Sequence, residues 1–284
     1  MISTDGDGVD SRQYIFSFAI ETLSLVPTDF VLPPDLRGLR AGVFLPQAEP
    51  DWFGRHKYPA RILLLTEREV VVVAHPTAGD EPLRFPLDRL ERLEWGRILL
   101  TGWIVFIWDT GQKQLLYNTR ARGPVEKFMR TFEDRWLPAR LRADARPPSV
   151  FGEPLNIKFE YARSAELVLG DTPLAQFFQP AICGTRRLLW FHQKSWSPGD
   201  LVAATTRRLL WITERRHGRY ERYGTVSHWA PLAAVAEIQC IRADNASELR
   251  ITFRSGGSWR IPLGENEEAA RAFAAAVQEC RSAG

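Results

Sequence analysis

The segment Pro86-Leu-Asp-Arg-Leu-Glu-Arg-Leu-Glu-Trp95 has a counterpart in Pro231-Leu-Ala-Ala-Val-Ala-Glu-Ile-Gln-Cys240, 145 residues further along the chain. Both segments begin with Pro-Leu and continue with aliphatic residues three positions apart. The same shift relates later positions: Ile104, Phe106 and Trp108 match Leu249, Ile251 and Phe253, the turn 109–112 matches the turn 254–257, and Phe128 matches Phe273. Because so many matches share one shift, we interpret the chain as two copies of one small domain.

The composition is that of a globular protein of about two domains. The 284 residues are 45% hydrophobic and 25% charged, and no apolar run approaches the roughly 20 residues of a membrane-spanning helix. Residues 1–11 lack the basic segment of a secretory signal. The three cysteines are widely spaced, which disfavours a disulfide framework or a clustered metal site. We therefore expect a cytoplasmic protein with no transmembrane segment and no cofactor.

Short runs of alternating apolar residues, or of β-branched and aromatic residues, predict many strands. In the first half we expect strands at 14–20, 62–66, 70–74, 83–87, 90–95, 102–108 and 114–118. In the second half we expect them at 157–161, 186–192, 202–206, 208–213, 226–232, 235–241, 248–254 and 258–263. In both halves a threonine closes the strand before a tight turn. A short helix is predicted between Pro173 and Pro180, because Thr172 can cap it, Pro173 suits its first position and Pro180 ends it.

Each half ends in a segment whose apolar residues recur at helical spacing. The first stripe consists of Val125, Phe128, Phe132 and Trp136, and the second consists of Ala270, Phe273, Val277 and Cys280. Between the halves, residues 143–149 include Pro147-Pro148 and have no apolar face, which is typical of a linker. The predicted organisation is therefore a domain at 12–142, a linker at 143–149 and a second domain at 150–284.

The order of these elements resembles the pleckstrin-homology (PH) superfamily, particularly its GRAM and bacterial PH-like members. In the first half the features that carry the resemblance are Leu63–Thr66, Glu69–Val73, Pro86–Leu90, the turn 109–111 and the helix 124–137. In the second half they are Val202–Thr206, Leu209–Ile212, Pro231–Val235, the turn 255–257 and the helix 266–280. The resemblance implies a mainly β fold of two partly open antiparallel barrels, each closed by one C-terminal helix.

The chain lacks the sequence motifs of the common enzyme classes. There is no G-x-S-x-G, Walker loop, G-x-G-x-x-G between strand and helix, or H-E-x-x-H. Cys183 and His192 are the one pair that suggests a nucleophile and a base, but a cysteine flanked by Ile182 and Gly184 is more often structural. We expect no catalytic residues and no enzymatic activity.

The densest basic cluster lies in the second half, between the strands expected at 208–213 and 226–232. It runs from Arg215 to Tyr223, whereas the matching connection in the first half, His75 to Glu81, has no Arg or Lys. In PH-like folds the loops after the first and third strands meet at the open end, and members that bind anionic head groups do so there. With 186–192 as the first strand, the resemblance implies a site formed by Lys194, Arg215, Arg216, Arg219 and Arg222, with Tyr220 or Tyr223 beside them. A solvated hairpin tip is the alternative interpretation.

These observations favour a non-enzymatic binding or adaptor protein whose second barrel recognises an anionic membrane surface or an acidic protein partner. Guanidinium groups donate paired hydrogen bonds that suit phosphate and carboxylate oxygens. One alternative is a structural protein–protein interaction module that uses sheet edges or apolar patches, and another is an enzyme with an unrecognised site. Nucleic-acid binding is disfavoured, because a net charge of +3 is far below the basic footprint of such proteins.

Overall fold

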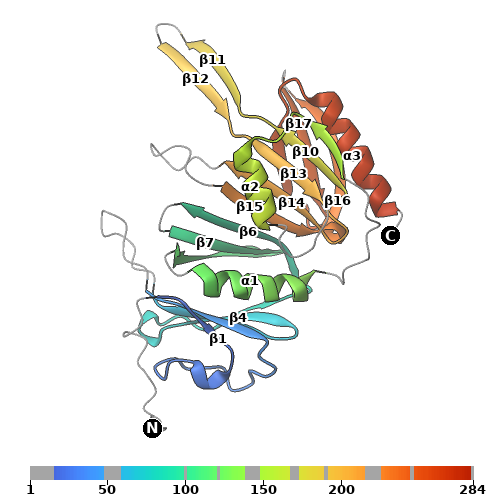
Figure 1. Cartoon of the computed structure of the whole chain (residues 1–284). Helices are drawn as coiled ribbons and strands as arrows, with labels where there is room; N and C mark the ends of the chain where they lie inside the picture. Colours follow the sequence, from blue (N-terminus) through green and yellow to red (C-terminus); the bar gives the residue numbers. More distant parts are fainter. Residues whose placement is uncertain are drawn as a thin grey trace. The chain divides into compact units, whose positions relative to one another are not determined.

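The computed structural model describes residues 16–47, 59–98, 101–119, 122–137, 148–166, 173–188, 191–214, 225–243 and 246–282. Strands predominate, and a long helix ends each half of the chain (Figure 1). The prediction of a mainly β protein with C-terminal helices is confirmed. Within the described ranges, every helix is too short or too polar to cross a membrane.

The chain divides into two compact units whose boundary does not follow the order of the sequence. Unit 1 comprises residues 1–90 and 99–136, and unit 2 comprises residues 91–98 and 137–284. Residues 91–98 therefore group with unit 2, although the predicted boundaries place them in the first domain. Whether the two halves fold as separate domains stays a prediction, and most of the predicted linker 143–149 lies outside the described residues.

Unit 1 consists of an antiparallel five-stranded sheet, a hairpin and a helix. The sheet has the order β1-β2-β3-β4-β5, with β1 Phe18–Ile20, β2 Ala41–Leu45, β3 Arg61–Leu65, β4 Glu69–Ala74 and β5 Leu83–Pro86. Strands β7 (Thr101–Trp108) and β8 (Gly111–Asn118) form the hairpin, and α1 (Arg122–Trp136) packs against β1 and β2. Short 3-10 helices at Leu23–Leu25 and Pro76–Ala78 complete the unit.

The main sheet of unit 2 has the order β6-β15-β14-β13-β10-β9. Its strands are β6 Leu90–Ile98, β9 Ser149–Gly152, β10 Ala175–Gln179, β13 Asp200–Ala204, β14 Arg208–Glu214 and β15 Thr225–Pro231. All neighbouring pairs are antiparallel except β9 and β10, which are parallel. Helix α2 (Ile157–Glu166) contacts β14.

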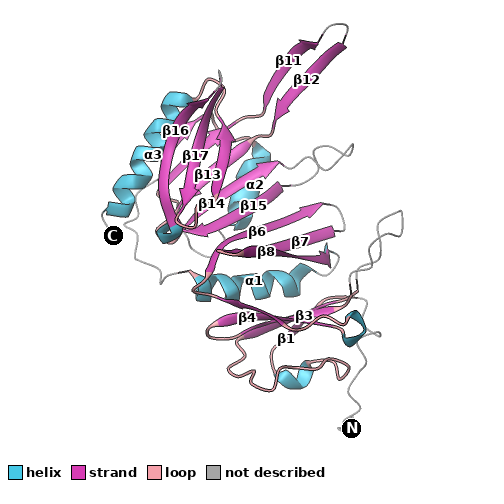
Figure 2. Cartoon of the chain, turned by 180° about the vertical axis from the view of Figure 1, so that it is seen from behind, coloured by secondary structure: helices cyan, strands magenta, loops and turns pink. Residues whose placement is uncertain are grey.

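Two smaller sheets and a helix complete unit 2 (Figure 2). Strands β11 (Ile182–Leu188) and β12 (Phe191–Ser197) form a separate hairpin. Strands β16 (Val235–Ala243), β17 (Ala246–Phe253) and β18 (Ser258–Pro262) form an antiparallel three-stranded sheet, preceded by a 3-10 helix at Leu232–Ala234. Helix α3 (Glu267–Ser282) packs against β9, β10, β16 and β17.

The apolar stripes of both long helices lie in the cores, except that the side chain of Cys280 is outside the described part of the structure. Phe128 of α1 and Phe273 of α3 are at most 1% exposed. Phe273 contacts the rings of Phe151 and Phe177, and it belongs to a cluster that includes Leu249 and Ile251 of β17. The burial predicted for the two phenylalanines is confirmed.

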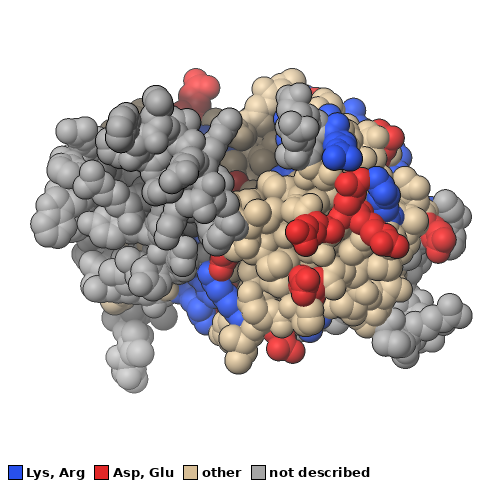
Figure 3. All heavy atoms as spheres, turned by 90° about the horizontal axis from the view of Figure 1, so that it is seen from above, with Lys and Arg blue, Asp and Glu red and all other residues tan. Residues whose placement is uncertain are grey.

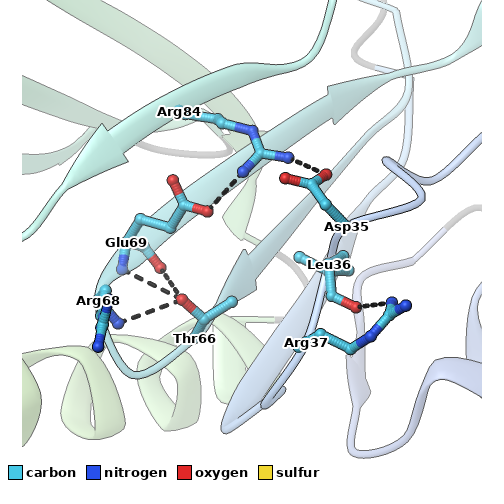
Figure 4. Close-up of polar contacts among 7 residues, drawn as sticks. All are labelled: Asp35, Leu36, Arg37, Thr66, Arg68, Glu69 and Arg84. Atoms are coloured by element: carbon cyan, nitrogen blue, oxygen red, sulfur yellow. Dashed lines mark hydrogen bonds and ion pairs between the residues drawn. The ribbon is translucent and has the colours of Figure 1, made fainter.

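The same turn follows a strand in each unit. In unit 1 the Thr66 hydroxyl accepts hydrogen bonds from the backbone N–H groups of Arg68 and Glu69 (Figure 4). In unit 2 the Thr205 hydroxyl accepts bonds from Arg207 and Arg208 in the same way. The position predicted in the second half was Thr206, one residue later. Such hydroxyl bonds favour tight turns because they satisfy N–H groups that the ladder leaves open.

A further bond links each turn to the repeated Pro-Leu segment. The N–H of Leu87 donates to the carbonyl of Arg68 at 2.8 Å, and the N–H of Leu232 donates to the carbonyl of Arg207 at 2.9 Å. In unit 1 the Arg84 side chain also joins Glu69 to Asp35 (Figure 4). Its hydrogen bond to Asp35 holds the pKa of that exposed carboxyl below its ordinary value.

Strand β6 is fixed to the second half of the chain by side chains as well as by pairing. The Glu91 carboxylate accepts hydrogen bonds from the backbone N–H of Ser255, at 3.2 Å, and from its hydroxyl. The Arg92 guanidinium lies 4.8 Å from the ring centroid of Phe253. The rings of Trp95 in β6 and Trp229 in β15 meet edge to face. These contacts explain why residues 91–98 group with unit 2.

Two predicted elements have a different structure. The segment 157–161 was predicted as a strand and is the start of α2, because the Asn156 side chain accepts a hydrogen bond from the N–H of Phe159 and so caps the first turn. The predicted short helix before Pro180 is strand β10, which pairs with β9 and β13. In the first predicted strand, only Phe18–Ile20 is a strand among the described residues.

The sheets are open, and no described sheet closes into a barrel. The predicted arrangement of two partly open barrels therefore stays a prediction.

Candidate functional site

Two insertions leave the main sheet of unit 2 at the same end. The last residue of β10, Gln179, is paired with the first residue of β13, Asp200, so the β11/β12 hairpin between them starts at this end (Figures 1 and 2). Strands β14 and β15 are joined here too, because Glu214 is paired with Thr225. We call the residues Gln179, Asp200, Thr213, Glu214 and Thr225 the loop end of the sheet.

The predicted site residues belong to these two insertions. Lys194 lies in β12, where it pairs with Thr185. The prediction that 186–192 is one strand followed by a loop carrying Lys194 is wrong, because a hairpin of two strands occupies this region. Residues Arg215, Arg216, Arg219, Tyr220, Arg222 and Tyr223 lie outside the described residues. The described strand ends on either side of both predicted segments therefore lie at one end of the sheet.

Helix α2 covers the loop end from one side. Lys158 Nζ lies 2.7 Å from Glu214 Oε1, directly before the Arg-rich segment begins. The Phe159 ring is 1% exposed and lies over Gly199, where an added Cβ would come within 3.0 Å of the ring. The base of the hairpin is therefore a packed junction.

The residue before helix α3 is fixed to the same end. The Asn266 side chain, directly before α3, donates a hydrogen bond of 3.2 Å to Gln179 Oε1. Gln179 is 3% exposed, and its own amide nitrogen donates to the carbonyl of Pro180. The loop end thus joins both layers of the unit.

Asp200 is a buried carboxyl at the centre of the loop end. Asp200 is 1% exposed, and its Oδ1 accepts a 2.8 Å hydrogen bond from Trp211 Nε1. Burial raises the pKa of Asp200 to about 7, the nearby Glu214 carboxylate adds to the rise, and Thr213 and Trp211 oppose it.

A row of larger side chains continues from Asp200 across the sheet. Trp211 stacks on His228 with ring centroids 4.4 Å apart, and His228 Nδ1 lies 3.8 Å from Glu94 Oε2 of β6. Trp259 of β18 contacts both rings from the second layer. Trp259 is 4% exposed and Trp211 is half-buried.

The described side chains do not form a metal centre. No three His, Cys, Asp or Glu residues in the described ranges lie close enough to hold a metal ion. Cys240 is a free thiol, and partial burial raises its pKa. The side chains of Cys183 and His192 fall outside the described part of the structure.

Charge on the described surface is mixed. Figure 3 shows acidic side chains gathered on a mostly uncharged face, with a few Lys and Arg side chains beside them. The main concentration of basic residues in the sequence, Arg215–Arg222, is not among the described residues.

Sequence reasoning missed Asp200. The residue lies two positions before Val202, at the start of the strand predicted at 202–206, and a spacing of two in a strand indicates the same face but not that a carboxyl there is buried.

Comparisons with known proteins identify no family for the chain. No family model matches it, and no curated protein matches it.

Proposed function

We propose that the chain is a non-enzymatic binding protein of two PH-like units, and that the loop end of unit 2 binds an anionic membrane surface or an acidic protein partner. The observation that carries the proposal is topological. The β11/β12 hairpin, which contains Lys194, and the Arg-rich connection 215–224 both start at the loop end. Basic segments that share one end of a sheet suit a surface rich in phosphate or carboxylate groups.

The PH-like interpretation is supported by the element order of unit 2. Four strands that are adjacent in the main sheet and antiparallel, β10, β13, β14 and β15, precede a three-stranded antiparallel sheet and a C-terminal helix. Unit 1 shows the matched threonine turn and the same Leu-to-Arg backbone bond. Both observations favour a duplicated ancestral domain.

The test is binding of the full chain to vesicles that contain about 30% phosphatidylserine, compared with neutral vesicles. The variant Arg215→Ser, Arg216→Ser, Arg219→Ser removes three charges from the basic segment. We expect wild-type binding that weakens as ionic strength rises, because the Debye length falls to about 8 Å at 0.15 M salt. We expect the triple variant to lose most of this binding without a change in melting temperature.

A matched control removes three arginines elsewhere in unit 2. Arg242, Arg254 and Arg260 are exposed, so Arg242→Ser, Arg254→Ser, Arg260→Ser changes the net charge equally. The control is expected to keep most of its binding. If the two triple variants bind equally, net charge and not the loop end governs binding. A different outcome is that wild type fails to bind these vesicles at low salt yet binds an acidic protein that the triple variant does not bind. In that case the partner is the acidic protein.

Exposed apolar side chains support the alternative of a protein–protein interaction module. Val150 of the edge strand β9 is 57% exposed, and Ile157 and Tyr161 of α2 are 86% and 67% exposed. Partner binding through these residues would persist at high salt, and substitution of Ile157 and Tyr161 by Ser would abolish it.

A further inference from the structure

Asp200 has an incomplete hydrogen-bond environment for a buried charge. Only Oδ1 is bonded, and Oδ2 has no hydrogen-bond partner among the described residues. Thr213 is directly opposite in the ladder, and its buried hydroxyl makes no hydrogen bond of standard geometry with another described residue; it acts on Asp200 in the direction that lowers the pKa, without reversing the rise caused by burial. A buried carboxylate without a cation and with one free oxygen is unstable relative to the neutral acid.

The surrounding charged groups do not compensate for ionisation. Glu214, one residue beyond Thr213, is itself acidic, and Lys158 of α2 already pairs with it. On β15 and β6, His228 and Glu94 lie beyond the indole ring of Trp211. The groups that β10 and α3 contribute nearby, Gln179 and Asn266, are uncharged amides bonded to each other.

Asp200 also lies where the ends of β13 and β14 meet, so a local opening there would affect the segments that start from these strands. It is the first residue of β13, and the β11/β12 hairpin ends just before it. The N–H of Glu214, the last residue of β14, donates to the carbonyl of Gly199, the residue directly before β13. A change at Asp200 therefore acts on the junction from which both insertions start.

We propose that Asp200 is a proton-dependent switch at the loop end: the neutral acid keeps the ends of β13 and β14 closed, and the carboxylate favours their opening. The direction of the pH dependence follows from the difference between the pKa of Asp200 in the closed state and its pKa in the open state. The pKa of Asp200 is about 7 when the end is closed and falls toward the ordinary value near 4 when the end opens to water. Opening therefore releases a proton at a pH between these values, and the closed state loses stability as the pH rises toward 7.

Amide hydrogen exchange of the full chain measures this opening directly. Rates for peptides covering β13 and β14, corrected for intrinsic exchange, give an opening constant at each pH. In wild type we expect the constant to rise about tenfold per pH unit between about pH 5 and 6.5 and to level off above about pH 7. In Asp200→Asn, whose amide oxygen still accepts from Trp211, we expect no pH dependence. Equal slopes in the two proteins would overturn the proposal.

Three further variants keep the test decisive. Trp211→Phe removes a donor that favours the carboxylate, so the levelling-off should move to higher pH even if Asp200→Asn does not fold. Glu265→Gln removes an exposed carboxylate one residue before Asn266 and should retain the wild-type slope. His228→Gln should also retain it. A slope abolished by His228→Gln would assign the effect to the histidine. Because exchange needs no ligand, the result is independent of the binding proposed above.

Discussion

Phe128 and Phe273 are the matching residues on which the packing of helices α1 and α3 depends. Each is at most 1% exposed, and Phe273 lies among aliphatic and aromatic side chains of its own unit. Truncation of either to Ala should lower the free energy of unfolding by about 3–5 kcal/mol, through lost burial and the cavity left behind. Urea denaturation of the full chain, followed by far-UV circular dichroism, measures the loss. The exposed Tyr161→Ala in α2 is the control and should change stability by less than about 0.5 kcal/mol. A loss below about 1 kcal/mol at both phenylalanines would contradict their place in the cores.

At the scale of elements, β6 pairs with a strand far away in sequence, because Gly96 lies opposite Val226 of β15. Glu91 accepts two hydrogen bonds from Ser255 in the turn between β17 and β18. A double-mutant cycle with Glu91→Gln and Ser255→Ala should give a coupling energy of about 1–2 kcal/mol, since hydrogen bonds to buried charged groups exceed the average. Thermal and urea unfolding of the four proteins supply the values.

Arg254→Ser in the same turn provides the control for this cycle, because Arg254 is exposed. Its coupling with Glu91→Gln should be near zero. The same near-zero value for Ser255 would mean that this carboxylate does not hold β6 to the second half.

The elements that could be predicted from sequence are those with a local signal. The valines of β4, the leucines of β3 and the apolar stripes of α1 and α3 specify their structure within a few residues. The alternation at 157–161 was ambiguous over so short a run, and the capping bond from Asn156 decides in favour of a helix. The aromatic segment of β10 became a strand because β9 and β13 pair with it on both sides, a constraint set by tertiary structure.

The only part of the candidate site that could be predicted from sequence is the part that a local concentration of one residue type reveals. The Arg-rich segment is visible in the sequence, and the strand order shows that the strands beside it end where the hairpin that contains Lys194 also joins the sheet. The burial of Asp200 was not predictable, because Trp211, Thr213 and Phe159 reach this end from other elements. The grouping of residues 91–98 with unit 2 was missed for the same reason, since their partners lie about 130 to 165 residues later.

At the scale of the whole molecule, the central claim is that the chain binds through the loop end of unit 2. Hydrogen exchange of the full chain, with and without vesicles that contain about 30% phosphatidylserine, tests it most directly because it reports every segment at once. The account predicts vesicle-dependent protection in peptides covering 182–197 and 215–224, and its loss at high salt. Protection confined to β9 and α2, around Val150, Ile157 and Tyr161, and unaffected by salt would contradict it.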